Sequence, residues 1–290
     1  MEGHDDTLGG TYALGSRRVH RVGYGAMQLA GDGFFGPPGG DGDGALVVLR
    51  AAVAGGVDHI DTAQYYGPGT VNRLIRDALY PYPAQLAIVS KVAASGDPSG
   101  LRRGIEDNLG TLGTDRLAAV NLRVMDPTEP PDRRFDAQLA ALVRARDEGL
   151  IEGVGISNVS REHLRRAADQ TSVVGVQNLF NLADQRSADV LADCQVRGIA
   201  FVPYCPLGLP GDQRTRLLTD PVLAAAASRL GATPVQVVLA WLLALAPNIL
   251  LIPGTRTRDH LAENLAADIR LDTATGGELN RHFSPAVPRN

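Results

Sequence analysis

Short apolar runs alternate along the chain with longer stretches in which apolar residues recur at helical spacing. The short runs predict buried strands, and the longer stretches predict amphipathic helices. Strands are expected at residues 22–25, 57–60, 86–89, 117–122, 153–156, 173–176, 199–202 and 249–251. Helices are expected at residues 45–54, 70–79, 98–112, 133–148, 161–169, 187–197, 221–230, 235–245 and 258–267. Ahead of them, residues 12–19 predict a hairpin with Gly15 and Ser16 at its turn.

This alternation predicts an α/β fold in which eight parallel strands close into a (β/α)8 barrel, the TIM barrel. The connections need no domain break, so residues 1–290 are expected to form a single barrel domain with an N-terminal hairpin. An open doubly wound sheet would instead need a G-x-G-x-x-G turn after an early strand. The segment Gly23-Tyr-Gly25 is only a fragment of that motif and opens no helix, so the barrel is favoured.

Composition narrows the classes of partner. Lys and Arg number 28 against 32 Asp and Glu, a net charge of −4 without a basic block, which argues against nucleic acid and anionic membranes. The two cysteines and the histidines have no metal-ligand spacing, so no metal is expected. The first twenty residues carry no apolar signal core, and no run reaches the ~18 apolar residues of a membrane helix. We expect a cytoplasmic protein with a small-molecule partner, and the sequence leaves the oligomeric state open.

The candidate chemistry lies where two successive strands end. Asp61 follows the strand at 57–60, Tyr66 comes five positions later, and Lys91 ends the next strand. Successive strands of a βα repeat bring such residues to one rim, which is where barrels hold their active sites. Free tyrosine titrates near pH ~10, and a lysine beside the phenol, fixed by a carboxylate, would favour the phenolate. The pattern therefore predicts that the pKa of Tyr66 is lowered toward neutral pH.

The set of Asp61, Tyr66 and Lys91 resembles the catalytic set of the aldo-keto reductases. Segments after the later strands extend the resemblance over roughly the whole chain, and they are Gly155-Ile-Ser-Asn158, Gln177-Asn178, Val202-Pro-Tyr-Cys-Pro-Leu-Gly208 and Ile252-Pro-Gly-Thr-Arg256. The resemblance implies an NADP-dependent enzyme that reduces an aldehyde or ketone to an alcohol by hydride transfer, with Tyr66 as proton donor. NADPH/NADP+ is the implied cofactor.

The resemblance also assigns the residues that bind the cofactor. A Ser-Asn pair and a Gln would hold the nicotinamide carboxamide, which offers one acceptor and two donors. An aromatic residue after strand seven would stack on the nicotinamide, and the residues after it would wrap the pyrophosphate. A hydroxyl and a cation after strand eight would meet the 2′-phosphate. The residues so assigned are Gly25, Met27, Ser157, Asn158, Gln177, Tyr204, Pro206, Leu207, Gly208, Gly254, Thr255, Arg256, His260, Glu263 and Asn264.

Three further segments are similar to the bacterial pyridoxal reductase (pyridoxine 4-dehydrogenase) branch of the superfamily. They are Tyr24-Gly-Ala-Met-Gln-Leu-Ala-Gly31, Val120-Asn-Leu-Arg-Val-Met125 and Ile249-Leu-Leu-Ile-Pro-Gly-Thr255. The chain is shorter than that branch after Lys91 and Met125 and differs between Gly208 and Pro221. Those loops would line the substrate, so a secondary-metabolism ketone or a sugar stays open beside a pyridoxal-like carbonyl.

Arg123 is a departure from the common pattern of the superfamily. Most members end strand four with a histidine that polarises the carbonyl, and Arg123 takes that place here. Arginine stays protonated, so it donates hydrogen bonds but gives up no proton. We expect it to polarise the carbonyl as part of the catalytic set. Binding a substrate phosphate or carboxylate, or neutralising Asp61, are alternatives. Asn121 lies two residues earlier and is expected on the same face of the strand, in the substrate pocket.

Several alternatives stay open for the other residues. Asp61 and Lys91 could be a structural ion pair, and Ser157 with Asn158 could cap the helix that begins near Arg161. Tyr65 is a rival to Tyr66 as the acid but lacks the five-residue offset, and we expect it in the substrate pocket. Phe34 and Phe35 lie in the first strand-to-helix loop, where a pocket wall is expected and loop packing is the alternative.

Two classes of function fit these residues. The first is the NADPH-dependent carbonyl reductase. The second is an NADP-binding sensor or regulatory subunit on a reductase fold, with little turnover. The intact set of Asp61, Tyr66 and Lys91 favours the enzyme, because a binding protein has no use for an activated phenol.

Overall fold

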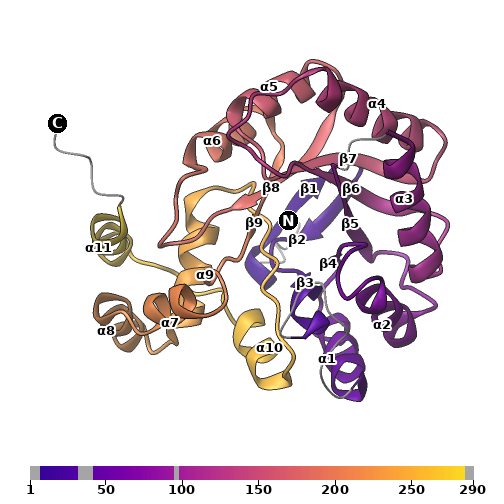
Figure 1. Cartoon of the computed structure of the whole chain (residues 1–290). Coiled ribbons are helices and arrows are strands. Elements are labelled where there is room, and N and C mark those ends of the chain that lie inside the picture. The colour runs from indigo at the N-terminus through magenta and orange to yellow at the C-terminus, as the bar shows by residue number, and fades with distance from the viewer. Residues whose placement is uncertain (1–6, 32–41, 95–97, 285–290) are drawn as a thin grey trace, which may run out of the picture.

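A curved sheet of parallel strands is the centre of the molecule (Figure 1). The computed structural model describes residues 7–31, 42–94 and 98–284. Within these residues seven strands hydrogen-bond in chain order, each with its sequence neighbour. They are β3 (Tyr24–Gly25), β4 (His59–Asp61), β5 (Ala87–Ala93), β6 (Leu117–Arg123), β7 (Ile151–Ser157), β8 (Val173–Leu179) and β9 (Ala200–Tyr204). The order and the parallel pairing are those expected of a (β/α)8 barrel.

The eighth predicted strand, at 249–251, is present only as two isolated parallel bridges. One joins Val22 to Leu251 and the other joins Phe201 to Ile249. The backbone N–H of Gly23 also donates to the carbonyl of Leu251 at 2.8 Å. This segment therefore bonds to both edges of the seven-stranded sheet and closes the barrel, although it is too short to count as a regular strand.

The N-terminal hairpin covers the bottom of the barrel, as Figure 1 shows for the indigo strands β1 (Thr11–Leu14) and β2 (Arg17–His20). Leu14 pairs with Arg17, so the predicted residues Gly15 and Ser16 form a two-residue turn, and Gly15 has a φ of 63°. The primed turns of two-residue hairpins need such a positive φ, which glycine adopts without strain. Apolar hairpin side chains then pack against small residues of the barrel interior, and the residues involved include Leu14, Val19, Ala87, Ala119 and Leu250.

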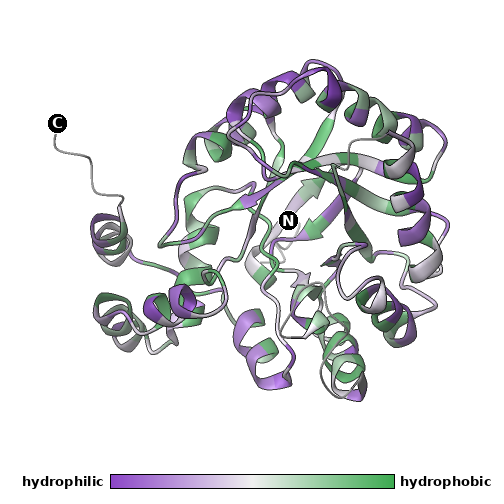
Figure 2. Cartoon of the chain, viewed as in Figure 1, coloured by the Kyte–Doolittle hydropathy of each residue, from purple (hydrophilic) through white to green (hydrophobic). Residues whose placement is uncertain are grey.

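Helices surround the sheet, with their apolar faces turned inward and their polar faces outward (Figure 2). The predicted helices are confirmed to within three residues at each end. They are α1 (Gly42–Ala54), α2 (Thr70–Leu79), α3 (Pro98–Leu112), α4 (Arg133–Asp147), α5 (Arg161–Ala168), α6 (Ala188–Arg197), α8 (Pro221–Leu230), α9 (Pro234–Leu245) and α10 (Arg258–Leu265). In the part of the chain that the structure describes, no single helix is long and apolar enough to cross a membrane.

The pattern did not reveal two α-helices, α7 (Asp212–Leu218) and α11 (Thr273–Phe283), or the short 3-10 helices η1 (Thr7–Gly9) and η2 (Ala26–Ala30). Helix α7 is short and largely polar, and α11 contains Gly276 and Gly277, so neither shows a clear apolar period. Tertiary contacts hold α11. Its Asn280 accepts a hydrogen bond of 2.7 Å from the indole N–H of Trp241. Trp241 is itself buried and stacks on Phe180.

Arg21 joins the barrel bottom to the helical layer. Its guanidinium donates to the carbonyls of Leu243 and Ala246 at the end of α9, both at 2.7 Å, and to the carbonyl of Ile249 at 3.2 Å. Burial lowers the pKa of this arginine from its ordinary value. The last carbonyls of a helix have no partner within the helix, so Arg21 satisfies acceptors that would otherwise be unpaired.

We predict that Arg21→Met lowers the free energy of unfolding by about 2–3 kcal/mol, because buried carbonyls lose a charged donor. Urea unfolding measures the change. Arg18→Met is the matched control in the same hairpin, since Arg18 is exposed and its Nε bonds only to the Thr11 hydroxyl among the contacts described. Equal stability of the two variants would contradict a structural role for Arg21.

Candidate active site

An ion pair between β4 and β5 lies at the centre of the candidate site. The ammonium of Lys91 donates to Asp61 Oδ2 at 2.5 Å and to the carbonyl of Thr62 at 2.8 Å. The side-chain amide of Gln177, from β8 across the barrel, donates to the other carboxylate oxygen at 2.8 Å. Lys91, Asp61 and Gln177 are all buried. The carboxylate is therefore held from two sides, and its position fixes that of the lysine.

Tyr66 completes the set that the sequence predicted. It lies in the turn after β4, where its N–H donates to the carbonyl of Ala63 at 3.1 Å. The Lys91 ammonium is 5.0 Å from the centre of the Tyr66 ring, and Tyr65 packs edge-on against the same ring with centres 5.3 Å apart. Asp61, Tyr66 and Lys91 thus lie together on one rim of the barrel.

The electrostatics at Tyr66 differ from the expectation. Burial raises the pKa of Tyr66 well above its ordinary value, the negative charge of Asp61 raises it further, and Arg123 opposes the shift. The predicted lowering of the Tyr66 pKa is therefore wrong for the protein alone, because burial and the Asp61 charge outweigh the opposing effect of Arg123. The phenol is therefore protonated at neutral pH, which is the form of a proton donor.

Arg123 ends β6 and faces the same region. Its guanidinium donates to the Ser157 hydroxyl at 3.3 Å and lies 5.2 Å from the centre of the Tyr204 ring. Among the described residues it has no carboxylate within ion-pair distance, and Asp61 is paired with Lys91 instead. The alternative that Arg123 neutralises Asp61 is therefore not the arrangement seen. Because Arg123 has no carboxylate partner among these residues, its positive charge is unbalanced at this rim.

A cavity of about 190 Å³ opens beside Tyr66. Its wall is mainly aromatic and aliphatic, with Arg123 as the cation that is not already paired. The lining residues are Met27, Tyr65, Tyr66, Lys91, Arg123, Gln177, Tyr204, Cys205, Leu209 and Pro210. An apolar pocket with a few polar groups is typical of a small-molecule site.

The residues expected in the substrate pocket fall in three places. Tyr65 lines the cavity, and burial raises its pKa to about 12. Asn121 does not line it but lies one layer deeper, inside the barrel, so its predicted place in the pocket is corrected. The register explains this, because Asn121 pairs with Lys91 and Gly155, one step below Arg123 and Ser157. Phe34 and Phe35 lie outside the described residues.

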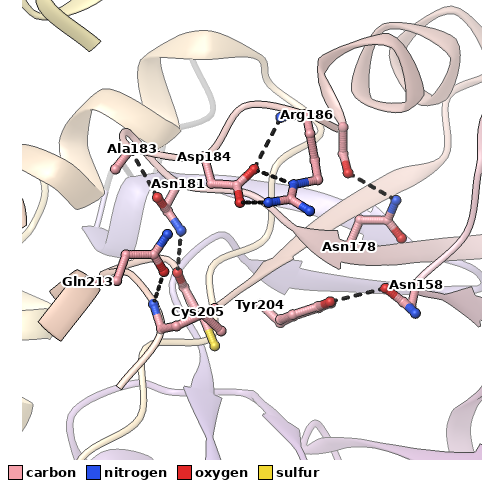
Figure 3. A network of polar contacts seen from close by, with 11 residues as sticks. Asn158, Asn178, Asn181, Ala183, Asp184, Arg186, Tyr204, Cys205 and Gln213 are labelled. Carbon is pink, nitrogen blue, oxygen red and sulfur yellow. Dashed lines mark hydrogen bonds and ion pairs between the residues drawn. The ribbon is translucent and has the colours of Figure 1, made fainter. Parts of the chain in front are cut away.

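The residues expected to hold a carboxamide are adjacent on β7 and β8. Asn158 has a φ of 56°, and its amide donates to the carbonyl of Val124 at 2.8 Å and accepts from the Tyr204 hydroxyl at 3.2 Å (Figure 3). The alternative that Ser157 and Asn158 cap a helix is wrong, because Ser160 caps α5. Gln177 Oε1 is buried and has no hydrogen-bond partner among the residues described. This acceptor fits the amino group of a carboxamide.

A second cavity, of about 60 Å³, adjoins the first and shares Met27, Tyr66, Tyr204, Cys205 and Pro210 with it. Seven of the residues expected to bind the cofactor line it, namely Gly25, Met27, Tyr204, Pro206, Leu207, Gly208 and Gly254. The loop after β9 that carries them is braced from outside. Asn181 donates to the carbonyl of Cys205 at 3.1 Å, and Gln213 accepts from the N–H of Leu209 at 2.8 Å (Figure 3).

Arg214, on α7, is a lining residue of this second cavity that the sequence reasoning missed. It lies beside Gly208, where an added Cβ would be 3.1 Å from the Arg214 Cα, so the loop and the helix are in close contact. Gly208 also has a φ of 87°, which a residue with a side chain rarely adopts. The only signal for Arg214 in the sequence was a cation shortly after Gly211-Asp212, and the helix that carries it, α7, was not predicted.

The residues expected at the adenosine end are grouped around the start of α10. Thr257 caps this helix by accepting from the N–H of His260, and Thr255 is buried and accepts from the N–H of Thr257 at 3.1 Å. Arg256 and His260 are exposed there. In the following turn Glu263 is half-buried and Asn264 is buried. A helix N-terminus with nearby cations suits a phosphate group.

Among the described residues, no cluster of three or more His, Cys, Asp or Glu side chains is arranged to hold a metal ion. The side chains at the rim instead offer amide, hydroxyl and guanidinium groups around two joined cavities. That donor set suits the polar groups of a dinucleotide and of a small carbonyl compound.

Comparisons with known proteins agree with this geometry. The model of the Aldo/keto reductase family matches residues 21–282. The chain is 45% identical over 271 residues to pyridoxine 4-dehydrogenase of Escherichia coli strain K12, covering 89% of this chain and 92% of the relative. An aldo/keto reductase from Klebsiella pneumoniae in complex with NADP and acetate superposes with a TM-score of 0.83 and 26% identity, over 97% of each chain. The NADPH complex of a Klebsiella pneumoniae aldo-keto reductase gives the same score and identity, over 97% and 96%.

Proposed function

The chain belongs to the aldo/keto reductase family, and from that premise we propose that Tyr66 is the proton donor in its reaction. The protein is an NADP-dependent oxidoreductase, and its family reaction is the NADPH-dependent reduction of a carbonyl compound. The observation that carries the proposal is the buried contact of Tyr66 with the Lys91–Asp61 pair, at a wall shared by both cavities.

NADPH supplies the hydride when it is bound. Gln177 and Ser157, with Asn158 beside them, would hold the carboxamide, through the buried Oε1 of Gln177 and the Ser157 hydroxyl. The Tyr66 hydroxyl gives its proton to the carbonyl oxygen, and the phenolate that remains lies beside the Lys91 ammonium. Asp61 accepts from that ammonium, and the Gln177 amide donates to the other oxygen of Asp61 and so fixes the carboxylate. Because the pKa of Tyr66 is raised by burial, the donor is loaded over the whole neutral range.

Arg123 stabilises the negative charge that develops on the carbonyl oxygen. Its guanidinium faces the cavity from β6, beside Tyr204 and Ser157, and has donors beyond the one that Ser157 takes. A fixed donor aimed at a developing oxyanion is among the larger contributions to catalysis. Arg123 takes over the polarising role that a histidine has in most of the superfamily.

For the substrate we propose a small, flat carbonyl compound of the pyridoxal type, with secondary-metabolite carbonyls as the alternative. The cavity is walled by the rings of Tyr65, Tyr66 and Tyr204, which suit a planar molecule. The similarity to the Escherichia coli pyridoxine 4-dehydrogenase supports pyridoxal as the first compound to test. A panel of aldehydes and ketones with NADPH tests this choice. If simple aldehydes are reduced and pyridoxal is not, the proposed substrate is wrong and the proposed reaction class still holds.

We predict that Tyr66→Phe lowers kcat by ~10²-fold or more, the usual scale for a lost general acid, while NADPH still binds. Steady-state NADPH oxidation measures kcat, and fluorescence titration measures NADPH binding. Tyr65→Phe is the matched control, because Tyr65 lines the same cavity and packs on the same ring. Tyr66 is not the donor if its variant keeps turnover within a few-fold of the parent.

We predict that the double change Thr255→Ala with Arg256→Ala narrows the preference for NADPH over NADH. The loss of charge-assisted contacts to the 2′-phosphate should raise the KM for NADPH and hardly change that for NADH. Thr255 also bonds to the N–H of Thr257, so Thr255→Ser with intact Arg256 is the control for the turn itself. Equal KM values of the parent for both cofactors would overturn the assignment.

We predict that Arg123→Leu lowers kcat by about 10–10²-fold with little change in NADPH affinity, because the lost interaction forms only in the transition state. Arg123→His should recover part of the activity, since histidine polarises the carbonyl in most of the superfamily. Kinetics and thermal melting of both variants are the measurement. A lowered melting temperature with unchanged kcat would instead assign Arg123 a structural role, and parent-like behaviour in both would remove it from the site.

A further inference from the structure

A small chamber lies inside the barrel directly below the candidate site. Its volume is about 20 Å³, and four of its lining residues, His59, Asp61, Asn121 and Gln177, are polar. The rest of the lining is apolar apart from backbone atoms, with Leu14, Val89, Ala119, Val174, Gly175, Val202, Leu250 and Ile252. Asp61 and Gln177 also belong to the rim described above, so the chamber and the site share a wall.

His59 is the polar side chain of the chamber that the proposed reaction does not use. It lies two residues before Asp61 on β4, so both side chains point into the barrel. His59 is only 3% exposed, and neither ring nitrogen has a hydrogen-bond partner among the described residues. The Asp58 carboxylate is 3.7 Å from Nδ1, beyond the usual hydrogen-bond length but within ion-pair distance. Against the effect of burial, His59 helps to lower the pKa of Asp58.

Two glycines make room for the polar side chains of the chamber. A Cβ added at Gly23 would lie 2.3 Å from the His59 ring, and a Cβ added at Gly155 would lie 1.9 Å from Asn121 Oδ1. Neither distance is possible for a real side chain. The neighbouring segments therefore have glycine where the side chains of His59 and Asn121 enter the barrel interior. These two polar side chains occupy the space that a side chain at Gly23 or Gly155 would need.

Buried polar atoms without partners are costly, so native proteins bond them to protein groups or to ordered water. To hold one water molecule, a chamber needs about 10–15 Å³ of free volume and two to four polar partners. The chamber has about 20 Å³ and a mainly apolar wall, and the buried side-chain polar atoms of its lining that have no partner among the described residues are the two ring nitrogens of His59 and Oε1 of Gln177. It is large enough for one water molecule and too small for an organic ligand.

We propose that the chamber binds one structural water molecule, which joins a ring nitrogen of His59 to Asp61 or to its neighbours Asn121 and Gln177. His59 is then a positioning residue, which acts on the reaction through the water and the carboxylate. Asp61 already accepts from Lys91 and Gln177, and the water adds a third contact from below. The role assigned to His59 rests on the proposed function of Asp61, Tyr66 and Lys91, whereas the water site does not.

A high-resolution crystal structure of the full chain tests the water site directly. The expected result is one ordered water within hydrogen-bond distance of a His59 nitrogen and of at least one of Asp61, Asn121 and Gln177. A dry chamber, or a His59 ring bonded directly to another side chain, would overturn the proposal. This outcome is independent of whether the protein reduces any carbonyl compound.

Two substitutions at His59 test the positioning role. His59→Leu removes both ring nitrogens and should lower kcat by about tenfold or more through a misplaced carboxylate, with little change in the KM for the carbonyl or in NADPH affinity. His59→Gln keeps a donor and an acceptor and should keep kcat within about threefold of the parent. Ile60→Val, on the opposite face of β4, controls for weakened packing.

Thermal melting separates these outcomes. If His59→Leu and His59→Gln have the same kcat as the parent and differ only in melting temperature, His59 is a packing residue and the proposal fails. If the parent itself shows no NADPH-dependent turnover, the proposed function fails instead, and the crystal structure alone judges the water site.

Discussion

The ion pair between Lys91 and Asp61 is the interaction on which the rest of the site depends. Both charges are buried at the rim of the barrel, and removing two charges from water is costly unless their geometry is good and their remaining lone pairs are satisfied. The amide of Gln177 and the carbonyl of Thr62 supply those extra bonds. Strands β4, β5 and β8 must therefore keep their register for the pair to form, and Tyr66 takes its position from that arrangement.

The same pairing decides the chemistry that the phenol can perform. Desolvation is the largest cause of the raised pKa of Tyr66, and the negative charge of Asp61 in the pair adds to it. A neutral phenol is suited to donating a proton to the oxygen of a carbonyl group that is being reduced. The positive charge of Lys91 would matter afterwards, when the phenolate has formed. Arg123 adds a cation that no described carboxylate balances, so the whole rim favours an oxyanion in the cavity.

The loop after β9 lies where the two cavities meet. The segment after β9 is braced by Asn181 and Gln213, and α7 brings Arg214 against it. Cys205 lines both cavities and has a left-handed φ of 51°. Burial raises the pKa of its thiol to about 11, so it is a wall of the site and not a nucleophile at neutral pH.

Sequence by itself determined the barrel, most helices and the set of Asp61, Tyr66 and Lys91, because periodicity, Gly and Pro punctuation and strand-end motifs are local properties of the chain. Tertiary structure alone decided the direction of the Tyr66 pKa shift, which depends on burial and on charges from β4, β5 and β6. It also placed Asn121 below the pocket, since strand register sets the layer a side chain occupies. Tertiary structure also decided how the eighth strand bridges its neighbours and what Arg214 and His59 contact. These contacts join segments that are far apart in sequence, and the sequence pattern carries no information about which distant segments come together.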